Sequence, residues 1–327
     1  MRVVMPYYGI PTGQTEEDVA MAYNRQILTD LLRDQLGFEG VICTDWGVVT
    51  GRIWGVEPLT VEERYLKSIE AGVDQYGGES DPEYIVNLVN QGAISEARID
   101  ESVRRILRNK FDLGLFETPF VDEAKVNALV NLPEYVSLGM TAQRNAVVLL
   151  DNGSGALPLA AETRIFVDGL DPSVAARYGK VVDTPDQADV VLLFLNTVFN
   201  GNQPAGTDRT LDQMMATRFP DTNLVFNKEI LAKAASFRDV SQLVTLVDLN
   251  RPAVLTELKG MSGALVGTFG VSDEAMLDVV FGRHNPLGKL PFELPSSMAE
   301  VEAQLEDVPD DTANPLFPFG WGLSYGE

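Results

Sequence analysis

The stretch Gly40-Val41-Ile42-Cys43-Thr44-Asp45-Trp46-Gly47 determines the fold class expected for the first part of this chain. Its apolar and small residues follow one another without alternation, which is typical of a strand buried on both faces in a parallel sheet. The residues before it, 31–38, have the pattern of an amphipathic helix that Gly37 closes. In such sheets the carboxyl ends of the strands carry the chemistry. Asp45 is expected at one of these ends.

Asp45 has two interpretations at this position. A carboxylate beside the flat apolar face of Trp46, at the mouth of a βα unit, is suited to engage a sugar ring. Asp is also favoured immediately before a helix, where its side chain caps free backbone N–H groups. These eight residues favour neither interpretation over the other.

The composition indicates a globular protein with two domains. The chain has 327 residues, which is enough for two domains with a core each. Hydrophobic residues make up 45% of it and charged residues 22%, and no apolar run approaches the roughly 20 residues that span a bilayer. The formal charge of −23 argues against nucleic acid and a membrane as partners, whereas a neutral substrate fits it.

The rare residue types exclude several kinds of site. A single cysteine, Cys43, excludes intrachain disulfides and cysteine-based metal clusters, and its place in an apolar strand predicts a packed small residue. The one histidine, His284, stands in a turn-like context and is not expected to act in catalysis. No glycine-rich phosphate loop follows any expected strand, which argues against a flavodoxin-like protein. The sequence therefore predicts neither a metal nor a cofactor.

Residues 1–110 predict the element order β-α-β-α-β-α-α, which is typical of a (β/α) barrel or a doubly wound sheet. The chain opens with a strand-like segment, without the pattern of a signal peptide. A closed barrel of this kind takes eight strands, so three parallel strands cannot form one. We therefore expect earlier strands outside this chain. The expected strands are 3–9, 41–45 and 73–79, and the helices are 18–36, 60–71, a helix from Pro82 and a helix from Ser95.

The rest of the chain predicts a linker and a second α/β domain. Residues 111–135 have the composition of a linker, and 136–327 resume the alternation of helices and apolar strands. These β-branched runs predict a buried, mainly parallel sheet with helices on both sides. The aromatic tail, 315–326, is expected to be packed because exposing it would be costly. The expected strands are 146–150, 164–167, 190–195, 243–247 and 264–268, and the helices lie near 134–145, 224–236, 253–259 and 273–281.

Four stretches, collinear from residue 3 to the end, carry more specific motifs. They are Val4-Met5-Pro6-Tyr7-Tyr8; residues 31–38 running into Thr44-Asp45-Trp46-Gly47; 145–150 with Leu157-Pro158-Leu159; and Phe317-Pro318-Phe319-Gly320-Trp321-Gly322-Leu323-Ser324-Tyr325. Together with 99–107 and 288–291, they resemble glycoside hydrolase family 3, the β-glucosidase-like enzymes. The resemblance implies a TIM-like barrel, represented here by its last three strands, followed by an α/β sandwich domain. It also implies retaining, exo-acting hydrolysis of β-linked glucosides or short β-glucans.

The resemblance also assigns roles to three residues. Asp45 matches the family's nucleophile, Tyr8 matches a tyrosine beside the nucleophile, and Trp46 matches the residue that walls the sugar site. A retaining glycosidase needs such a carboxylate and a second carboxyl group about 5–5.5 Å away as acid/base. The nucleophile must stay ionised, while the acid needs a raised pKa to protonate the leaving oxygen.

The acid/base group departs from the family pattern. Many members place a Glu in a loop of the sandwich domain before an Asp-Arg pair. Here Asp208-Arg209 resemble that pair, but Ala205 occupies the expected Glu position and the loop 200–209 contains no Glu. Asp208 is expected to pair with Arg209 or to cap a helix. The family's alternative, an Asp-His dyad, would lie in the missing barrel part, and His284 does not match it.

Glu79 is the candidate acid/base within this chain, because it follows the strand expected beside that of Asp45. As the acidic start of the next helix it has a second interpretation, which we favour. Asp74, in the same strand, either faces the barrel interior or holds a loop.

The leading hypothesis is therefore the carboxyl-terminal portion of a β-glycosidase. Its partners are a β-linked oligosaccharide or glucoside and either the missing amino-terminal barrel half or further copies of the chain, because an open sheet exposes strand edges. A periplasmic or extracellular location is expected if the full-length form carries a signal peptide. The alternative is a non-catalytic carbohydrate-binding or assembly remnant. This alternative is favoured by Ala205, which occupies the position expected for the acid/base Glu.

Overall fold

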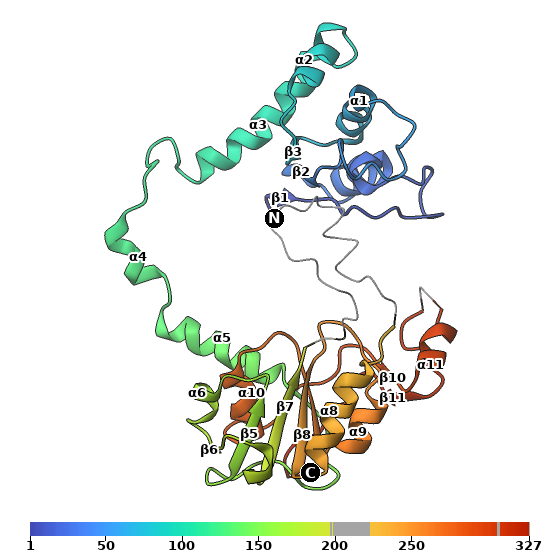
Figure 1. The fold of residues 1–327 in the computed structure, drawn as a ribbon. Helices are drawn as coiled ribbons and strands as arrows, with labels where there is room; N and C mark the ends of the chain where they lie inside the picture. The colour runs from blue at the N-terminus through green and yellow to red at the C-terminus, as the bar shows by residue number, and fades with distance from the viewer. Residues whose placement is uncertain (197, 199–222, 306–307, 327) are drawn as a thin grey trace. The chain divides into compact units, whose positions relative to one another are not determined.

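The computed structural model describes residues 1–196, 198, 223–305 and 308–326. It divides into two compact units, Met1–Val126 and Asn127–Glu327, each with its own sheet and helices (Figure 1). The boundary falls within the segment predicted as a linker, 111–135. That segment also contains helix α4, Glu123–Leu129, which the sequence analysis did not predict.

The sheet of the first unit has three parallel strands, as expected. They are β1 (Val3–Val4), β2 (Val41–Trp46) and β3 (Gln75–Gly77), in the order β1-β2-β3. Val3 is aligned with Val41, and Cys43 with Gln75. Strand β1 is shorter than the predicted 3–9. Pro6 lies just beyond it and has no N–H to continue the hydrogen-bond ladder.

Helix signals in the first unit were accurate where capping residues mark them. Helix α1 (Val61–Ala71) begins after Thr60, whose side chain forms a capping box with Glu63, and ends at Gly72, which has φ +117°. Helix α3 (Glu96–Asp112) begins after Ser95, whose hydroxyl accepts from the N–H of Arg98. Helix α2 is Glu83–Asn90, directly after Pro82.

The helix predicted at 18–36 was wrong in its start and its type. The structure has a 3-10 turn, η1 (Met21–Tyr23), followed by η2 (Gln26–Gln35), which has the wider hydrogen bonding of a π-helix. Asn24 explains the break between them, because its side chain is buried and accepts a hydrogen bond from the N–H of Ile27 at 3.1 Å. That bond sets the beginning of η2.

Asp74 holds the helices of the first unit to its sheet. Its carboxylate is fully buried. It accepts from the N–H of Ile42 at 2.9 Å and from the hydroxyl of Ser102 at 2.7 Å. It also forms ion pairs with Arg33 at 2.6 Å and Arg105 at 2.8 Å. Because these partners come from η2, β2 and α3, one carboxylate ties three elements together, which settles the role that the sequence left open.

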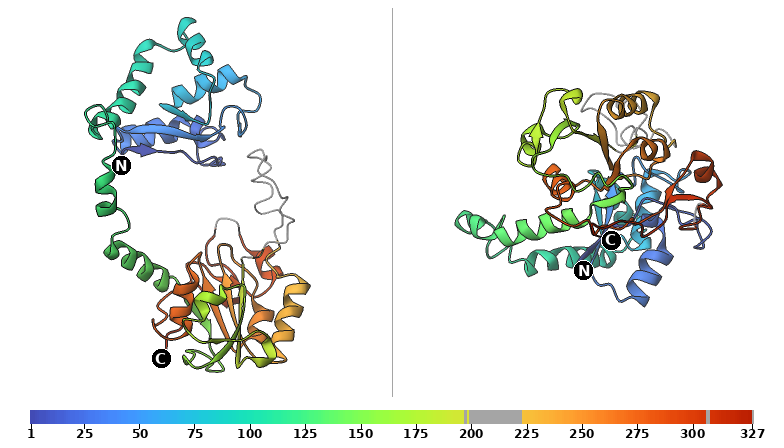
Figure 2. Two further views of the ribbon diagram at one scale, coloured as in Figure 1. Left: turned by 60° about the vertical axis from the view of Figure 1, so that its left-hand side comes forward. Right: turned by 90° about the horizontal axis from the view of Figure 1, so that it is seen from below.

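The second unit contains a six-stranded, mainly parallel sheet, as predicted. Among the described strands of this sheet, β4 alone is antiparallel to its neighbour, β9. The left view in Figure 2 shows the strands with helices on two sides. The strand order is β4 (Val148–Asp151), β9 (Ala264–Thr268), β8 (Gln242–Asp248), β7 (Val190–Leu195), β5 (Arg164–Asp168) and β6 (Lys180–Val181).

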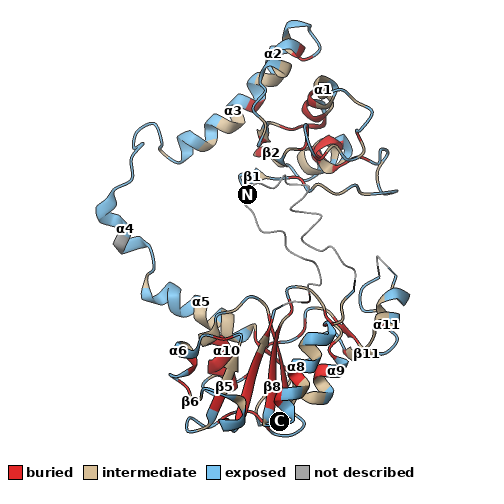
Figure 3. Ribbon diagram, viewed as in Figure 1, coloured by how far each residue is buried: buried red, intermediate tan, exposed pale blue. Residues whose placement is uncertain are grey.

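Two cores lie on the two faces of this sheet. Along β7, Leu192 belongs to one cluster, and Val191 and Leu193 belong to the other. Both faces of the strands are therefore buried, as Figure 3 shows, which is the reason for their uninterrupted apolar sequences. The first cluster includes residues of α6 (Pro172–Ala175) and α10 (Asp273–Val280), and the second includes residues of α8 (Lys228–Arg238) and α9 (Thr256–Met261).

The aromatic tail contacts this sheet but is packed only in part, whereas the sequence predicted it to be packed: Phe319 and Trp321 are 59% and 37% exposed. The indole N–H of Trp321 donates to the carbonyl of Leu150 at 2.8 Å, and the N–H of Leu323 donates to that of Leu149 at 2.8 Å. Phe317 is buried. The remaining elements are α5 (Pro133–Asn145), η3 (Pro185–Gln187), α11 (Met298–Ala303) and the antiparallel pair β10 (Leu294–Pro295) and β11 (Pro315–Phe317). Within the described ranges, none of the helices has the length and apolar character to cross a membrane.

Candidate active site

Asp45 lies near the carboxyl end of β2 and does not cap a helix. Its Oδ1 atom accepts a hydrogen bond from the N–H of Trp46 at 2.7 Å. The residues that follow form turns, and the next helix, α1, is capped by Thr60. The half-buried carboxylate of Asp45 is therefore at the strand end where parallel sheets carry their chemistry.

Tyr8 and Arg52 both bind the carbonyl of Trp46, the residue after Asp45. The Tyr8 hydroxyl donates to the carbonyl of Trp46 at 2.7 Å. Arg52 Nη1 donates to that carbonyl at 3.2 Å and to the Tyr8 hydroxyl at 3.3 Å. The guanidinium also lies over the Tyr8 ring, 4.7 Å from its centre.

Two opposite charges act on the pKa of the Tyr8 hydroxyl. Burial raises its pKa, and the neighbouring Asp45 carboxylate raises it further, whereas the charge of Arg52 lowers it. Tyr8, Asp45 and Trp46, the residues to which the family resemblance assigns roles, therefore lie together at the end of β2.

Trp46 presents an exposed indole that rests on glycine. The residue is 56% exposed. Its ring lies against Gly77 and Gly78: a Cβ on Gly77 would stand 2.9 Å from Trp46 Cε3, and one on Gly78 would overlap Trp46 Cδ1. Glycine at these positions therefore allows the indole to lie flat on the end of β3.

Replacing Gly78 by alanine is expected to displace the Trp46 ring. Gly78 has φ +69°, so alanine there costs about 1–2 kcal/mol from backbone strain alone, and the overlap with the indole adds to this. Gly13 is a matched control, because its φ is +68° and nothing lies within 4 Å of its Cβ position. Urea unfolding and tryptophan fluorescence measure the two effects. Equal stability losses and identical spectra for the two variants would contradict the expected contact.

Glu79 holds the loop that follows Trp46. Its Oε1 accepts from the N–H of Val49 at 2.9 Å and of Thr50 at 3.2 Å, and its Oε2 accepts from the Thr50 hydroxyl at 2.9 Å. These three bonds engage both carboxylate oxygens of Glu79 with the loop, whereas a general acid must reach the leaving oxygen of the substrate. This arrangement favours a structural role, and the acid/base assignment of Glu79 stays a prediction.

Replacing Glu79 by alanine is expected to destabilise the first unit by about 1.5–3 kcal/mol, since bonds to a charged acceptor are lost. The control is Glu39→Ala, which removes an 86% exposed side chain and should change stability by about 0.5 kcal/mol or less. Urea unfolding monitored by tryptophan fluorescence compares them. If the two variants are equally stable, the three bonds of Glu79 contribute nothing to the fold.

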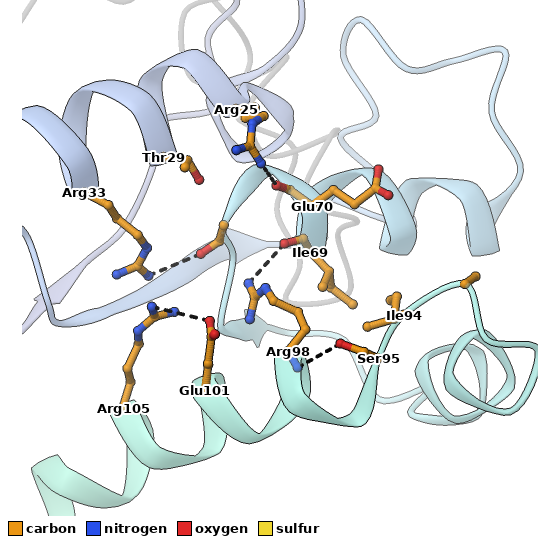
Figure 4. A pocket seen from close by; sticks show the side chains of 12 residues that line it. Arg25, Thr29, Arg33, Ile69, Glu70, Ile94, Ser95, Arg98, Glu101 and Arg105 are labelled. Atoms are coloured by element: carbon orange, nitrogen blue, oxygen red, sulfur yellow. Dashed lines mark hydrogen bonds and ion pairs between the residues drawn. The ribbon is translucent and has the colours of Figure 1, made fainter.

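A cavity of about 560 Å³ lies where β2 and β3 begin, at the end opposite to Asp45 (Figure 4). Its lining includes Arg33, whose guanidinium donates to the carbonyls of Gly40 and Gly72, the residues just before β2 and shortly before β3. Arg98, Glu101 and Arg105 of α3 also line it. The cavity is therefore associated with the Asp74 network and not with Asp45.

The other candidates contribute no second chemical group. Burial raises the pKa of the Cys43 thiol, so the thiol is a poor nucleophile. In the part of the chain that the structure describes, no three His, Cys, Asp or Glu residues are grouped to hold a metal ion. The loop with Ala205 and Asp208-Arg209 lies outside the described residues.

Arg52 is the member of this site that the sequence analysis missed. It is only 2% exposed. Arg52 lies in a loop that also contains Gly47, Gly51 and Gly55. The sequence of this loop has no hydrophobic periodicity that would predict a buried side chain. The position of Arg52 depends on Tyr8, 44 residues earlier.

Comparison with known proteins identifies the family. The profile "Glycosyl hydrolase family 3 N terminal domain" matches residues 2–109, and "Glycosyl hydrolase family 3 C-terminal domain" matches 175–325. The chain is 43% identical to "Probable beta-glucosidase C" of Aspergillus flavus and 38% identical to "Periplasmic beta-glucosidase/beta-xylosidase" of Dickeya chrysanthemi. Each match covers 98% of this chain and 52% of the relative.

Solved structures show the same relation. The β-glucosidase from Listeria innocua in complex with glucose matches with a TM-score of 0.75 and 25% identity, over 94% of this chain and 50% of that structure. The chain thus spans about half the length of the relatives it matches. With profiles of both family domains aligned to it in order, the chain belongs to glycosyl hydrolase family 3.

Proposed function

We propose that this chain is the carboxyl-terminal part of a retaining, exo-acting β-glucosidase-like enzyme, with Asp45 as its nucleophile. The observation that carries the proposal is the position of Asp45 at the carboxyl end of β2, beside Tyr8 and the exposed indole of Trp46. In this proposal β1, β2 and β3 are the last three strands of a (β/α) barrel. The second unit is the α/β sandwich domain of the family.

The reaction takes place in two balanced steps. First, an Asp45 oxygen bonds to the anomeric carbon while the bond to the leaving oxygen breaks, and that oxygen keeps the electron pair and takes a proton from the acid. In the second step, water bonds to the anomeric carbon and gives a proton to the conjugate base of that acid. The bond between the anomeric carbon and Asp45 breaks, and its electron pair returns to the carboxylate. Trp46 forms one wall of the sugar site.

The proposed substrates are β-linked glucosides or short β-glucans. Relatives that match most of this chain bear the name β-glucosidase. The Listeria innocua enzyme has been solved with glucose, and a variant of it with laminaribiose. An exposed indole beside a carboxylate suits such neutral rings, and the acidity of the chain does not oppose them.

We also propose that activity needs further barrel strands. Strands β1 and β3 have one neighbour each in the described sheet, and a closed barrel takes eight strands. Near β1, Val3, Met5 and Tyr7 are 48%, 56% and 69% exposed. An unpaired parallel edge with apolar side chains favours association with another chain.

A complementation assay tests this function. Hydrolysis of an aryl β-glucoside is measured for the 327-residue chain alone and after addition of the amino-terminal half of the Aspergillus flavus relative. Turnover is expected only in the mixture. Turnover by the chain as a monomer would overturn the need for further strands, and a mixture that associates by light scattering but stays inactive would count against the enzyme.

A non-catalytic sugar-binding or assembly role is the second candidate. It is favoured by Ala205 at the position where many family members have the acid/base Glu, and by the three bonds that engage Glu79 elsewhere. Replacing Asp45 by alanine distinguishes the two: an enzyme loses nearly all turnover, whereas a binding module keeps most of its affinity for a β-linked disaccharide.

A further inference from the structure

The cavity between η2 and α3 is rich in arginine (Figure 4). Four of its twelve lining residues are arginines, whereas the whole chain has 25 basic residues among 327. Its volume of about 560 Å³ is that of a small-molecule site. In a chain with a formal charge of −23, such a lining is a local property of this cavity. The four arginines are Arg25, Arg33, Arg98 and Arg105.

The spacing of the lining residues explains why they meet in one place. On α3, Arg98, Glu101 and Arg105 are separated by three and four residues, so they share one face of the helix. Across the cavity, Thr29 and Arg33 belong to η2, which has π-helical hydrogen bonding. Such bonding is rare and is frequently found at functional sites. The two helices therefore present polar and basic side chains to the same space.

Part of this positive charge serves the fold. Arg33 and Arg105 form ion pairs with Asp74 at 2.6 and 2.8 Å, and Arg98 Nη1 lies 3.9 Å from the same carboxylate. Arg98 also donates to the carbonyl of Ile69 at 3.0 Å. One fully buried carboxylate is therefore shared by three guanidinium groups.

Like charges repel one another within this cluster. Burial lowers the pKa of Arg33, the Asp74 carboxylate raises it, and the charges of Arg105 and Arg98 lower it. The Nε atom of Arg33 is buried with no hydrogen-bond partner among the described residues. An anion in the cavity stabilises such a cluster, because it interacts favourably with several guanidinium charges at once.

The carboxylates that line the cavity offset this charge only in part. Glu70 and Glu101 are both exposed, so solvent and salt screen their charges. Glu101 Oε2 lies 3.8 Å from Arg105 Nη2, which is too far for a hydrogen bond. Arg25 is also exposed and lies 3.8 Å from Asp30. Within the described part of the chain, Arg105 Nη2 therefore has donors that no acceptor engages.

We propose that this cavity binds the phosphate group of a small molecule, which Arg105 contacts and the charges of Arg25 and Arg98 attract. The planar fork of an arginine matches the oxygen atoms of a phosphate. Ser95, which precedes α3, also lines the cavity, and the amino end of a helix favours an anion. The cavity lies at the end of the strands opposite to Asp45, so this site is separate from the proposed sugar site and does not depend on the proposed function.

The test is calorimetric titration of the 327-residue chain with inorganic phosphate and, separately, with glucose 6-phosphate, in chloride buffers of equal ionic strength. Glu101→Gln removes a negative charge from the lining of the cavity. Its matched control is Asp100→Asn, which removes a charge from the adjacent residue of α3, where Asp100 pairs with Arg104 outside the lining. Arg105→Gln removes the proposed contact, and Arg104→Gln is its control.

We expect saturable binding of one phosphate group per chain. Glu101→Gln should tighten binding about three- to tenfold, the effect of one charge at short range in a partly solvated site. Asp100→Asn and Arg104→Gln should change the affinity by about twofold or less, because their charges are screened. Arg105→Gln should weaken binding about tenfold or more, because a charge-assisted contact is lost.

The two ligands distinguish the source of the phosphate group. Tighter binding of glucose 6-phosphate than of inorganic phosphate identifies a phosphate ester as the ligand, since the rest of the cavity then contributes to affinity. Equal or weaker binding of the ester identifies free phosphate.

A lack of saturable binding for both ligands would overturn the inference, and so would an unchanged affinity in Arg105→Gln. An equal gain in Glu101→Gln and Asp100→Asn would also overturn it, because the gain would then reflect the net charge of the chain. If Arg105→Gln does not fold because its bond to Asp74 is lost, the comparison of Glu101→Gln with Asp100→Asn still decides, since both of these side chains are exposed.

Discussion

Replacing Asp45 by asparagine is expected to lower kcat/KM for an aryl β-glucoside by about 10³-fold or more, the scale seen when a catalytic nucleophile is removed. The amide has nearly the shape of the carboxylate but cannot form the glycosyl ester. Because Asp45 also accepts the N–H of Trp46 through Oδ1, the amide oxygen can keep this bond. The variant should therefore fold and lose only the chemistry. The measurement uses the chain together with the amino-terminal barrel part that gives the highest turnover.

Asp81→Asn is the control for this loss. Asp81 is exposed in the loop after β3, so the same change there should leave kcat/KM within about twofold. Incubation with a 2-fluoro glucoside that forms a slowly hydrolysed ester adds a direct readout, since peptide mass should place the sugar on Asp45. Labelling at another carboxylate, or full turnover by the asparagine variant, would remove Asp45 from the nucleophile role.

Local signals in the sequence predicted elements that are decided locally. Strands β7 and β9 have the predicted bounds because their apolar runs are buried on both faces and end at polar residues or glycine. Helix α1 lies close to the predicted 60–71 because Thr60 and Gly72 cap its two ends, and capping depends on residues within one turn. The helix at 18–36 failed because the buried Asn24 interrupts it, and the burial of one amide is not visible in a periodic pattern.

The candidate site likewise contains residues that the sequence predicted and contacts that it could not predict. The resemblance to a family singled out Tyr8, Asp45 and Trp46, and the structure places them together at the end of β2. Arg52 depends on a contact with Tyr8, and Glu79 on the loop at Val49 and Thr50, thirty and twenty-nine residues earlier. Contacts at such separations follow from the packed chain, so composition and spacing alone could not reveal them.

Asp74→Asn is expected to have the largest effect on stability. Removing one partner of a buried ion pair costs about 3–5 kcal/mol, because the other charge is left uncompensated. Here Arg33 and Arg105 would both lose their carboxylate, and the amide of asparagine would face further donors from Ile42 and Ser102. Since the unfolding free energy of a domain is about 5–15 kcal/mol, this loss is a large part of what holds the first unit folded.

Urea unfolding followed for each unit distinguishes a loss of stability in the first unit from a loss in the whole chain. Two of the three tryptophans, Trp46 and Trp54, lie in the first unit, so their fluorescence follows its unfolding. The midpoint of this transition should fall sharply in Asp74→Asn, while the second unit is unchanged. In the control Asp100→Asn, an exposed pair with Arg104 is lost, and the cost should be about 0.5 kcal/mol or less. Equal midpoints in the two variants would show that the Asp74 network is not needed.

The pH dependence of stability is a second, independent test of the role of Asp74. Burial by itself would raise the pKa of Asp74, but hydrogen bonds from Ile42, Ser102 and Arg105 and the charge of Arg33 outweigh it and lower the pKa below its ordinary value. A lowered pKa in the folded state stabilises the fold above the unfolded value of about 3.9, and this contribution is lost as the pH falls through the folded value. The stability difference between the parent chain and Asp74→Asn should therefore be constant near neutral pH and shrink below about pH 4. A difference that grows on acidification would mean that Asp74 is protonated in the folded protein, which its four donors contradict.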